Sequence, residues 1–426
     1  MEEYKHRIAD KILARKLAGK GAVLIEGPKW CGKTTTAEQQ AASVLYMGDT
    51  DQRENNMRLA SLTPSRLLEG ESPRLIDEWQ VAPVLWDAVR FAVDHRAGHG
   101  FFILTGSAVP QEKDRETIVH TGTGRFSWLR MRPMSLWESG DSNGSVSLEN
   151  LFSAPDNIEG ESDLSLDDVA FLTCRGGWPD ASTLKGEIAL DQAFDYFDAI
   201  VNQDISRVDG VRRDANRTKR LMRSYARFQG AQATIKAIRQ DMLINDTDSL
   251  DEDTVSSYIR ALKKIFVIED MPAWNPNLRS KAAVRSSDNR YFIDPSIAVA
   301  ALQAGPQDLI SDLETFGLLF ETLCVRDLRV FADSLQGSVY HYRDSNGLEC
   351  DAVVHLRNGR YGLVEIKLGG EDNLNHAAES LKKVSNVIDT TRMRAPSFLM
   401  VLTAVGRYAY RREDGIYVVP IGCLKD

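Results

Sequence analysis

The chain has 426 residues, of which 43% are hydrophobic and 27% are charged, and its formal net charge at pH 7 is −9. This length predicts two to four domains with separate cores, and the composition is that of a globular protein rather than a fibrous or disordered one. No stretch is apolar enough to span a membrane, the first ten residues carry charges, and the five cysteines lack C-x-x-C spacing, so we expect a cytoplasmic protein without a secretory signal, zinc site or disulfides.

The first predicted elements are a strand at 22–25, a loop at 27–34 and a helix at 34–42. The loop matches G-x-x-x-x-G-K-[ST] in the strand–loop–helix context of a phosphate-binding loop, whose backbone N–H groups and helix N-terminus hold phosphate oxygens. Lys33 would reach the β- and γ-phosphates, and Thr34 would ligate Mg²⁺. The residues expected to bind ATP or GTP are Gly27, Pro28, Lys29, Trp30, Cys31, Gly32, Lys33, Thr34 and Thr35. A flexible loop that matches the pattern by chance is the alternative.

Two later strands supply the partners that a phosphate loop needs. A short apolar strand at 73–78 ends in Asp77, which would hold Mg²⁺, and in Glu78, which would polarise the attacking water. A second strand at 101–107 ends in Ser107, placed to sense the γ-phosphate or orient the water. A solvated turn after a strand is the alternative interpretation of the two carboxylates.

Strands that alternate with helices, among them a strand at 44–47 and a helix at 85–94, predict a parallel sheet wound on both faces. A glutamate after the metal-binding aspartate favours ATP hydrolysis, and no N/T-K-x-D guanine-reading stretch is present. Arg125, in a glycine-rich segment at 120–126, is expected to face a γ-phosphate of the same subunit or, in a homo-oligomer, of a neighbour. An ordinary surface arginine is the alternative.

The middle of the chain begins with an acidic segment at 141–166, which we expect to be an exposed linker. Helical periodicity resumes at 188–205, where an apolar stripe predicts a lid helix beside the nucleotide. The expected stripe is Leu190, Phe194, Phe197, Ile200 and Val201.

Three further helices are predicted at 218–228, 234–242 and 254–266, the last two capped by Thr234 and Thr254. Their short connections match a helix-turn-helix, and the segments 267–271 and 291–293, with the polar stretch 275–289 between them, could supply a wing. Three basic residues of the third helix could meet DNA phosphates, although packing between domains is the alternative that we favour. These residues are Arg260, Lys263 and Lys264.

Near the C-terminus, the segments 348–354 and 361–368 predict a β-hairpin around a turn at 358–359. Glu365 and Lys367 lie two residues apart and therefore share one face of a strand. With Asp351 on the neighbouring strand they form the D…E-x-K arrangement of PD-(D/E)xK nucleases, in which the carboxylates bind Mg²⁺ or Mn²⁺ and the lysine activates water. Glu321, on a helix at 318–330, would add a carboxylate. A solvated charge pair on an edge strand is the alternative.

Taken together, these motifs resemble those of the AAA-type ATP-binding proteins of bacteria and archaea that carry a C-terminal domain of unknown function, and the resemblance spans nearly the whole chain. The segments that carry it are Gly27–Thr34, Leu75–Gln80, Leu104–Ser107, Gly124–Arg125, Arg132–Ser135 and Cys174–Pro179. The resemblance implies an α/β fold class with a P-loop NTPase parallel sheet, a helical and winged-helix middle, and a mixed α/β domain similar to restriction endonucleases. The corresponding domain boundaries are 1–140, 141–210, 211–300 and 301–426.

Two functions remain open at this point. An ATPase that uses ATP and Mg²⁺ could control, through its nucleotide state, a nuclease-like and DNA-facing C-terminal domain. A regulatory switch or scaffold that binds a protein partner, with no nuclease activity, is the second. The overall acidity does not exclude DNA, because the segment 207–227 carries eight Lys or Arg residues against two Asp.

Overall fold

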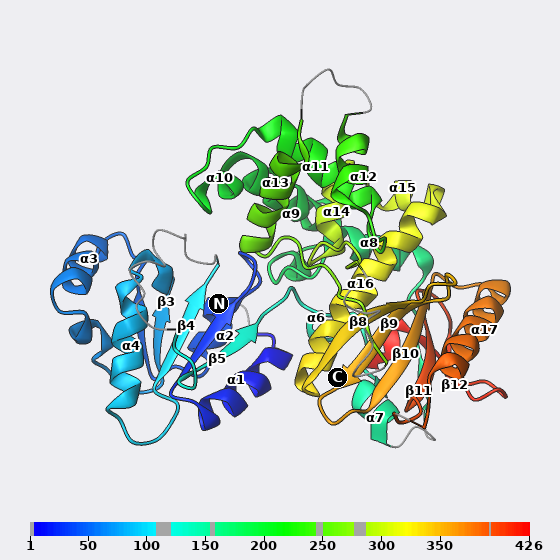
Figure 1. Ribbon diagram of the computed structural model, residues 1–426, viewed down its shortest axis with the longest axis horizontal. Coiled ribbons are helices and arrows are strands. Elements are labelled where there is room, and N and C mark those ends of the chain that lie inside the picture. Colours follow the sequence, from blue (N-terminus) through cyan, green and yellow to red (C-terminus); the bar gives the residue numbers. More distant parts are fainter. Residues whose placement is uncertain (1–3, 108–120, 154–157, 244–249, 277–286, 392) are drawn as a thin grey trace. The chain divides into compact units, whose positions relative to one another are not determined.

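A computed structural model describes residues 4–107, 121–153, 158–243, 250–276, 287–391 and 393–426 (Figure 1). The chain divides into two compact units. The first comprises Met1–Pro133, Asn202–Arg213 and Arg260–Val267, and the second comprises Met134–Val201, Asp214–Ile259 and Ile268–Asp426. Within the described ranges, no helix has both the length and the apolar character needed to cross a bilayer.

The first unit is built on a five-stranded sheet in which every strand pair is parallel, with strand order β2-β3-β4-β1-β5. This confirms the predicted parallel α/β sheet, and the four predicted strands agree with the observed ones to within one residue at either end. The strands are β1 (Ala22–Glu26), β2 (Ser43–Tyr46), β3 (Arg74–Asp77), β4 (Phe102–Gly106) and β5 (Phe126–Arg130).

Helices cover both faces of this sheet. Helix α1 (Ile8–Gly19) contacts β1 and β5, and α2 (Lys33–Glu38) contacts β3 and β4. Helix α2 ends four residues before the predicted end at Ala42, because the Ala42 N–H already bonds the Pro73 carbonyl beside β3. The remaining helical elements are α3 (Arg53–Leu62), η1 (Pro64–Leu68), η2 (Trp79–Val81) and α4 (Val84–Asp94).

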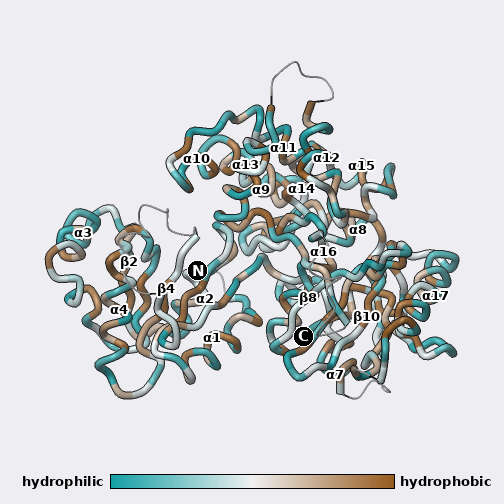
Figure 2. The backbone as a smooth tube through the Cα atoms, in the orientation of Figure 1, coloured by the Kyte–Doolittle hydropathy of each residue, from teal (hydrophilic) through white to brown (hydrophobic). Residues whose placement is uncertain are grey.

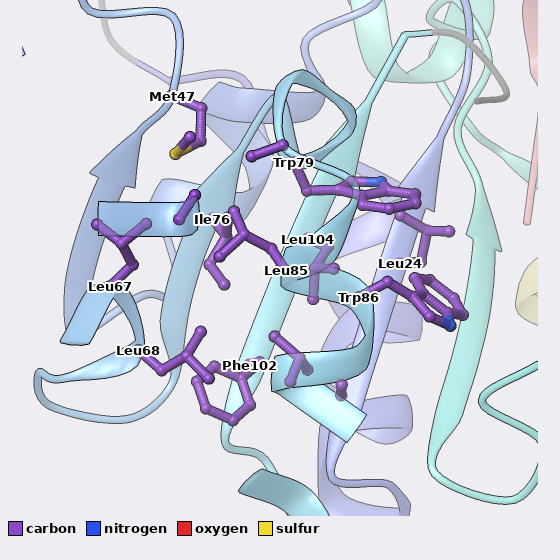
Figure 3. Close-up of a cluster of buried hydrophobic side chains, with 14 of the residues drawn as sticks. Leu24, Met47, Leu67, Leu68, Ile76, Trp79, Leu85, Trp86, Phe102 and Leu104 are labelled. Atoms are coloured by element: carbon purple, nitrogen blue, oxygen red, sulfur yellow. The ribbon is translucent and has the colours of Figure 1, made fainter. Parts of the chain in front are cut away.

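The core of the first unit lies between the sheet and α4 (Figure 3). Alternate strand residues point to one face of a sheet, so the side chains of Leu24, Ile76 and Leu104 meet helix residues such as Leu85 there. Trp86 stacks on Phe126 with ring centroids 4.0 Å apart. Burying each large apolar side chain of this kind contributes about 2 kcal/mol to the free energy of folding. The packed core therefore holds the strands in place, together with the polar residues at their ends.

The second unit contains a mixed seven-stranded sheet with order β7-β12-β13-β11-β10-β9-β8. The predicted hairpin is confirmed, since β9 and β10 pair in antiparallel fashion with Tyr361 opposite His355. Strand β10 is coloured hydrophobic in Figure 2, whereas much of helix α17 is hydrophilic. The elements are α16 (Leu313–Ser334), β8 (Gly337–Arg343), β9 (Glu349–Leu356), β10 (Tyr361–Lys367), α17 (Glu371–Val387), β11 (Phe398–Thr403), β12 (Tyr408–Arg411), β13 (Tyr417–Pro420), η6 (Ile421–Cys423) and β14 (Leu424–Lys425).

The expectation that the acidic segment at 141–166 is an exposed linker is wrong. Strand β6 (Val146–Ser147) pairs with β14, and β7 (Gly160–Glu161) pairs with β12 of the seven-stranded sheet. Leu148 and Leu151 of the intervening helix are fully buried. Glu149, Glu161 and Asp163 are exposed while a few apolar side chains of the segment are buried, so composition alone misrepresented this segment. The helices here are α6 (Leu136–Ser139) and α7 (Leu148–Ser153).

The predicted helix at 188–205 is present, but its buried face differs from the expected stripe. Phe194 is 37% exposed, whereas Ala189, Ala193 and Tyr196 are buried. The centroid of the Tyr196 ring lies 4.3 Å from that of Trp178, so the buried face of the helix is anchored by this aromatic contact. The elements are α8 (Leu166–Arg175), η3 (Ala181–Thr183), α9 (Gly186–Ala199), a π-helical turn η4 (Ile200–Asp204) and α10 (Ile205–Arg207).

Three helices follow, as predicted: α11 (Ala215–Arg227), α12 (Ile235–Met242) and α13 (Glu252–Lys264). The Thr234 cap is confirmed, since its side chain accepts a hydrogen bond from the Ala237 N–H. The Thr254 cap is wrong, because the helix begins at Glu252 and Asp251 accepts the Thr254 N–H at 2.6 Å. Isolated bridges then join 229 to 290, 268 to 292 and 271 to 289. Part of the expected wing, 277–286, lies outside the described residues.

A buried ionic network explains the glycine pair at 176–177. Arg326 lies within 2.9 Å of Asp294, whose carboxylate also accepts the Gly177 N–H at 3.0 Å. A Cβ at Gly177 would lie 2.1 Å from the Met134 carbonyl oxygen, so only glycine fits there. The two segments 132–135 and 174–179 therefore meet at a backbone contact. The flanking helices are α14 (Pro295–Leu302) and α15 (Pro306–Ser311).

Candidate functional site

The phosphate loop leaves the carboxyl end of β1 and enters α2 through residues in left-handed conformations. Trp30 has φ 63° and Gly32, the N-cap of α2, has φ 91°. The Lys33 ammonium lies inside the loop and donates to the Pro28 carbonyl at 2.6 Å. The loop thus holds one cation inside its own curve, at the place where a phosphate site requires positive charge.

Gly27 is fixed by a close approach to the edge strand of the same sheet. A Cβ at this position would lie 2.1 Å from the Met131 carbonyl oxygen, directly after β5. That carbonyl cannot move freely, because the Met131 N–H bonds the Glu26 carbonyl at 2.7 Å.

Replacing Gly27 by alanine is expected to lower the free energy of unfolding by about 1–3 kcal/mol, the usual cost of inserting an atom into a packed site. Urea unfolding of Gly27→Ala, compared with Gly48→Ala, measures this. No atom lies within 4 Å of a Cβ at Gly48, so that control is expected to change stability by less than about 0.5 kcal/mol. Equal stabilities of the two variants would contradict the predicted close approach.

The two side chains expected to ligate a metal ion, Thr34 and Asp77, meet at the carboxyl end of β3. The Thr34 hydroxyl donates to Asp77 Oδ1 at 2.6 Å, and the Thr105 hydroxyl donates to the same oxygen at 2.7 Å. Hydroxyl and carboxylate oxygens are the ligands that Mg²⁺ prefers, and phosphate oxygens and water usually complete its shell. Thr34 and Asp77 therefore fit the ion expected of them from the sequence.

Glu78 follows at once, in a left-handed conformation with φ 55° and ψ 45°. Its carboxylate accepts hydrogen bonds from the Ser107 hydroxyl at 2.8 Å and from the Gln80 amide. Its own N–H donates to the Thr105 hydroxyl at 3.3 Å. The structure thus brings the predicted Glu78 and Ser107 together and adds Thr105 and Gln80, which sequence reasoning missed although both lie within or beside predicted strands.

The remaining loop residues divide into two groups. Lys29 is half exposed and pairs with Asp204 at 2.6 Å, and Trp30 is 53% exposed. Cys31 is buried, and its carbonyl accepts a hydrogen bond from Arg7 at 2.8 Å. Arg7 was not expected from the sequence; it braces the loop from the start of α1. Thr35 is exposed on the first turn of α2.

Arg125 does not lie at this edge of the sheet, so the expectation that it faces the γ-phosphate of its own chain is wrong. It immediately precedes β5, and its carbonyl accepts the Ala22 N–H at the amino end of β1. The phosphate loop begins after Glu26, roughly 13 Å away at 3.3 Å per residue. Arg125 instead bonds Asp94 at 2.7 Å and lowers the pKa of that carboxyl. Action on a neighbouring subunit stays a prediction.

The predicted charged residues of the C-terminal hairpin also lie together. The Lys367 ammonium lies 3.0 Å from Asp351 and 2.9 Å from Glu365, and Asp351 accepts the Ile366 N–H at 2.7 Å. Burial, followed by the charge of Asp351, raises the pKa of Glu365 to about 8. Burial lowers the pKa of Lys367, but the two carboxylates outweigh it and leave that pKa raised. The solvated pair considered as the alternative is excluded for Glu365, which is only 5% exposed.

Glu321 of α16 accepts a hydrogen bond from the Tyr291 hydroxyl, and removal from water together with the charge of Asp351 raises its pKa to about 8. Each carboxylate of the cluster is thus already bonded to a donor of the protein. In the described part of the chain, no group of three or more His, Cys, Asp or Glu side chains could hold a metal ion. The Lys367 ammonium lies between Asp351 and Glu365, and the metal site expected at Glu321, Asp351 and Glu365 stays a prediction.

Comparisons with known proteins agree with the first-unit geometry. Residues 19–139 match the model of an AAA domain, in agreement with the P-loop domain expected there from the sequence. Residues 166–308 and 316–424 match two domains of unknown function, DUF8612 and DUF4143. No curated protein matches the chain. Among solved structures, it is similar to a Walker-type ATPase of Pyrococcus abyssi at 14% identity and a TM-score of 0.43, over 68% of this chain and 94% of that one.

Proposed function

We propose that this protein binds ATP with Mg²⁺ and hydrolyses it at the carboxyl edge of the first-unit sheet. The observation that carries the proposal is the hydrogen-bonded chain from Thr34 through Asp77 and Thr105 to Glu78 and Ser107. It supports the proposal because Thr34 and Asp77, the proposed metal ligands, lie beside the Glu78 carboxylate, and Thr34 ends the proposed phosphate loop. The AAA-domain match over the same residues supports it.

The residues have distinct roles in this reaction. Lys33 leaves the Pro28 carbonyl and neutralises β- and γ-phosphate oxygens. Glu78 takes a proton from the attacking water as its oxygen bonds to the γ-phosphorus, and the bond from that phosphorus to the β-phosphate oxygen breaks to leave ADP. Mg²⁺, when bound, offsets the phosphate charge. Thr105 holds Asp77 and the Glu78 backbone in place.

For the C-terminal part, we propose a nuclease-like fold that binds nucleic acid without cutting it. The element order α16, β8, β9, β10, α17, β11, with Glu321, Asp351 and Glu365–Lys367 in sequence along it, supports the fold. The bonds that Lys367 makes to Asp351 and Glu365 favour binding over cleavage, since they occupy oxygens that a catalytic metal ion would need. The three helices α11–α13 with their bridges support a winged-helix-like middle, and a protein-binding scaffold remains the second candidate.

ATP turnover in the presence and absence of DNA tests both parts. Asp77→Asn is expected to lower kcat at least a hundredfold, because metal-assisted charge stabilisation is lost. DNA that stimulates turnover, with an affinity that falls steeply with salt, would support the nucleic-acid role. No DNA affinity at low salt would favour the scaffold, and full activity of Asp77→Asn would refute hydrolysis at this site.

A further inference from the structure

Gln80 lies two residues after Glu78, and it contacts the carboxylate that we propose as the base. Its amide nitrogen donates to Glu78 Oε2, while Ser107 donates to Oε1 at 2.8 Å. A carboxylate offers about four lone-pair positions. The two donors therefore hold one oxygen each and leave positions free for a water molecule.

The backbone explains how a residue so near in sequence can turn back onto Glu78. Left-handed backbone is uncommon for a non-glycine residue and is held only when the surroundings impose it. At Glu78 the Thr105 hydroxyl accepts its N–H, and the short η2 turn that follows carries Gln80 round to the carboxylate. The left-handed backbone at Glu78 thus brings the Gln80 amide within hydrogen-bonding distance of the Glu78 carboxylate.

Space for the Gln80 amide comes from a glycine on the neighbouring strand. A Cβ at Gly106 would lie 2.9 Å from Gln80 Oε1 and 3.2 Å from Trp79 Nε1. Among the residues that the structure describes, Gln80 Oε1 is buried and has no hydrogen-bond partner. Because the amide oxygen makes no hydrogen bond, the bond from the amide nitrogen to Glu78 is what orients the Gln80 side chain.

We propose that Gln80 is a positioning residue for ATP hydrolysis, which fixes the Glu78 carboxylate in the orientation that receives the proton of the attacking water. The inference rests on the proposed function and assigns a role that the phosphate-loop motifs do not. In this role Gln80 acts on the Glu78 carboxylate and not on the phosphates. Its loss should therefore slow the chemical step and leave ATP affinity unchanged.

Steady-state phosphate release by the full chain, together with titration of a fluorescent ATP analogue, tests the assignment. For Gln80→Leu we expect kcat to fall roughly tenfold to a hundredfold, the worth of one hydrogen bond to a charged group. KM and analogue affinity should stay within about twofold of wild type. Gln80→Glu keeps the shape of the side chain but removes the hydrogen-bond donor, so its kcat should fall as far as that of Gln80→Leu. Gln192→Leu, at a partly exposed glutamine on α9, is the control and should match wild type.

A double-mutant comparison separates positioning from a general structural effect. In a Glu78→Gln background, Gln80→Leu should cost nothing further, because the carboxylate that it orients is gone. An equal loss in both backgrounds, a rise in kcat, or loss of analogue binding in both Gln80 variants would each overturn the inference. Wild-type protein that releases no phosphate would instead refute the proposed function itself, whereas active wild type with a fully active Gln80→Leu refutes the positioning role alone.

Discussion

Lys33→Ala is expected to weaken ATP binding roughly tenfold to a hundredfold and to abolish measurable turnover. The lysine is 7% exposed and is held inside the loop by the Pro28 carbonyl, so no other cation of the loop can take its place at the phosphates. A charge-assisted hydrogen bond in a buried site is worth about 1.5–3 kcal/mol in binding. Lys33 also stabilises the charge that develops on the transferred phosphoryl group in the transition state. Its removal is therefore expected to lower kcat by more than it lowers ATP affinity.

Lys29→Ala is the matched control, since it removes a lysine from the same loop. Lys29 is half exposed and engaged with Asp204, and exposed ion pairs contribute at most about 1 kcal/mol. We therefore expect its ATP affinity and kcat to change less than about fivefold. Calorimetric titration with ATP and phosphate-release kinetics check both variants. Equal losses in the two, or binding by Lys33→Ala at wild-type affinity, would place the nucleotide elsewhere.

The residues of the proposed nucleotide site could be brought together from the sequence because each is tied to a local pattern. Loop, strand and helix follow one another in the segment 22–42, and Asp77, Glu78 and Ser107 each end a predicted strand. Carboxyl ends of parallel strands meet at one edge, so strand assignment alone brings these side chains together. Gln80 was missed because its contact depends on a left-handed backbone at Glu78, which no sequence pattern announces.

Arg125 was placed wrongly for a related reason. A glycine-rich segment suggests a phosphate-facing loop, but its side of the sheet depends on whether a strand begins or ends there. Here β5 begins directly after Arg125, which puts the arginine at the amino edge, beside Asp94 at the end of α4. Neither the start of β5 nor its pairing with β1 was predicted.

The C-terminal cluster shows the limit of motif spacing. The order Asp351, Glu365, Lys367 gave the right strands and the right shared face. It could not show whether the carboxylates are open to a metal or paired with the lysine, because that depends on burial by α17 and on donors such as Ser380. Whether the carboxylates bind a metal ion or pair with Lys367 is decided by the balance of positive and negative charge inside the fold.

That charge balance has a measurable consequence for stability. The pKa of Glu365 is raised from about 4.5 to about 8, so the folded protein holds a proton there that the unfolded chain releases above pH 5. The stability contributed by this protonated carboxyl is complete below pH 4.5 and is lost as pH rises toward 8, at up to about 1.4 kcal/mol per pH unit. Glu365→Gln keeps the shape without the titration. We expect its free energy of unfolding to fall less steeply than that of wild type between pH 5 and 8.

The slope should be reduced rather than abolished, because Glu321, whose pKa is also raised to about 8, still titrates. Urea unfolding at pH 5, 6, 7 and 8 measures the slopes, with Glu379→Gln as the control, since Glu379 lies on α17 with its side chain 61% exposed. Lys367→Met at pH 7 should lower stability by about 3 kcal/mol, since it leaves Asp351 without its counter-charge. Parallel slopes for wild type and Glu365→Gln would mean that Glu365 is ionised in the folded protein. Its carboxylate would then be open to a metal ion after all.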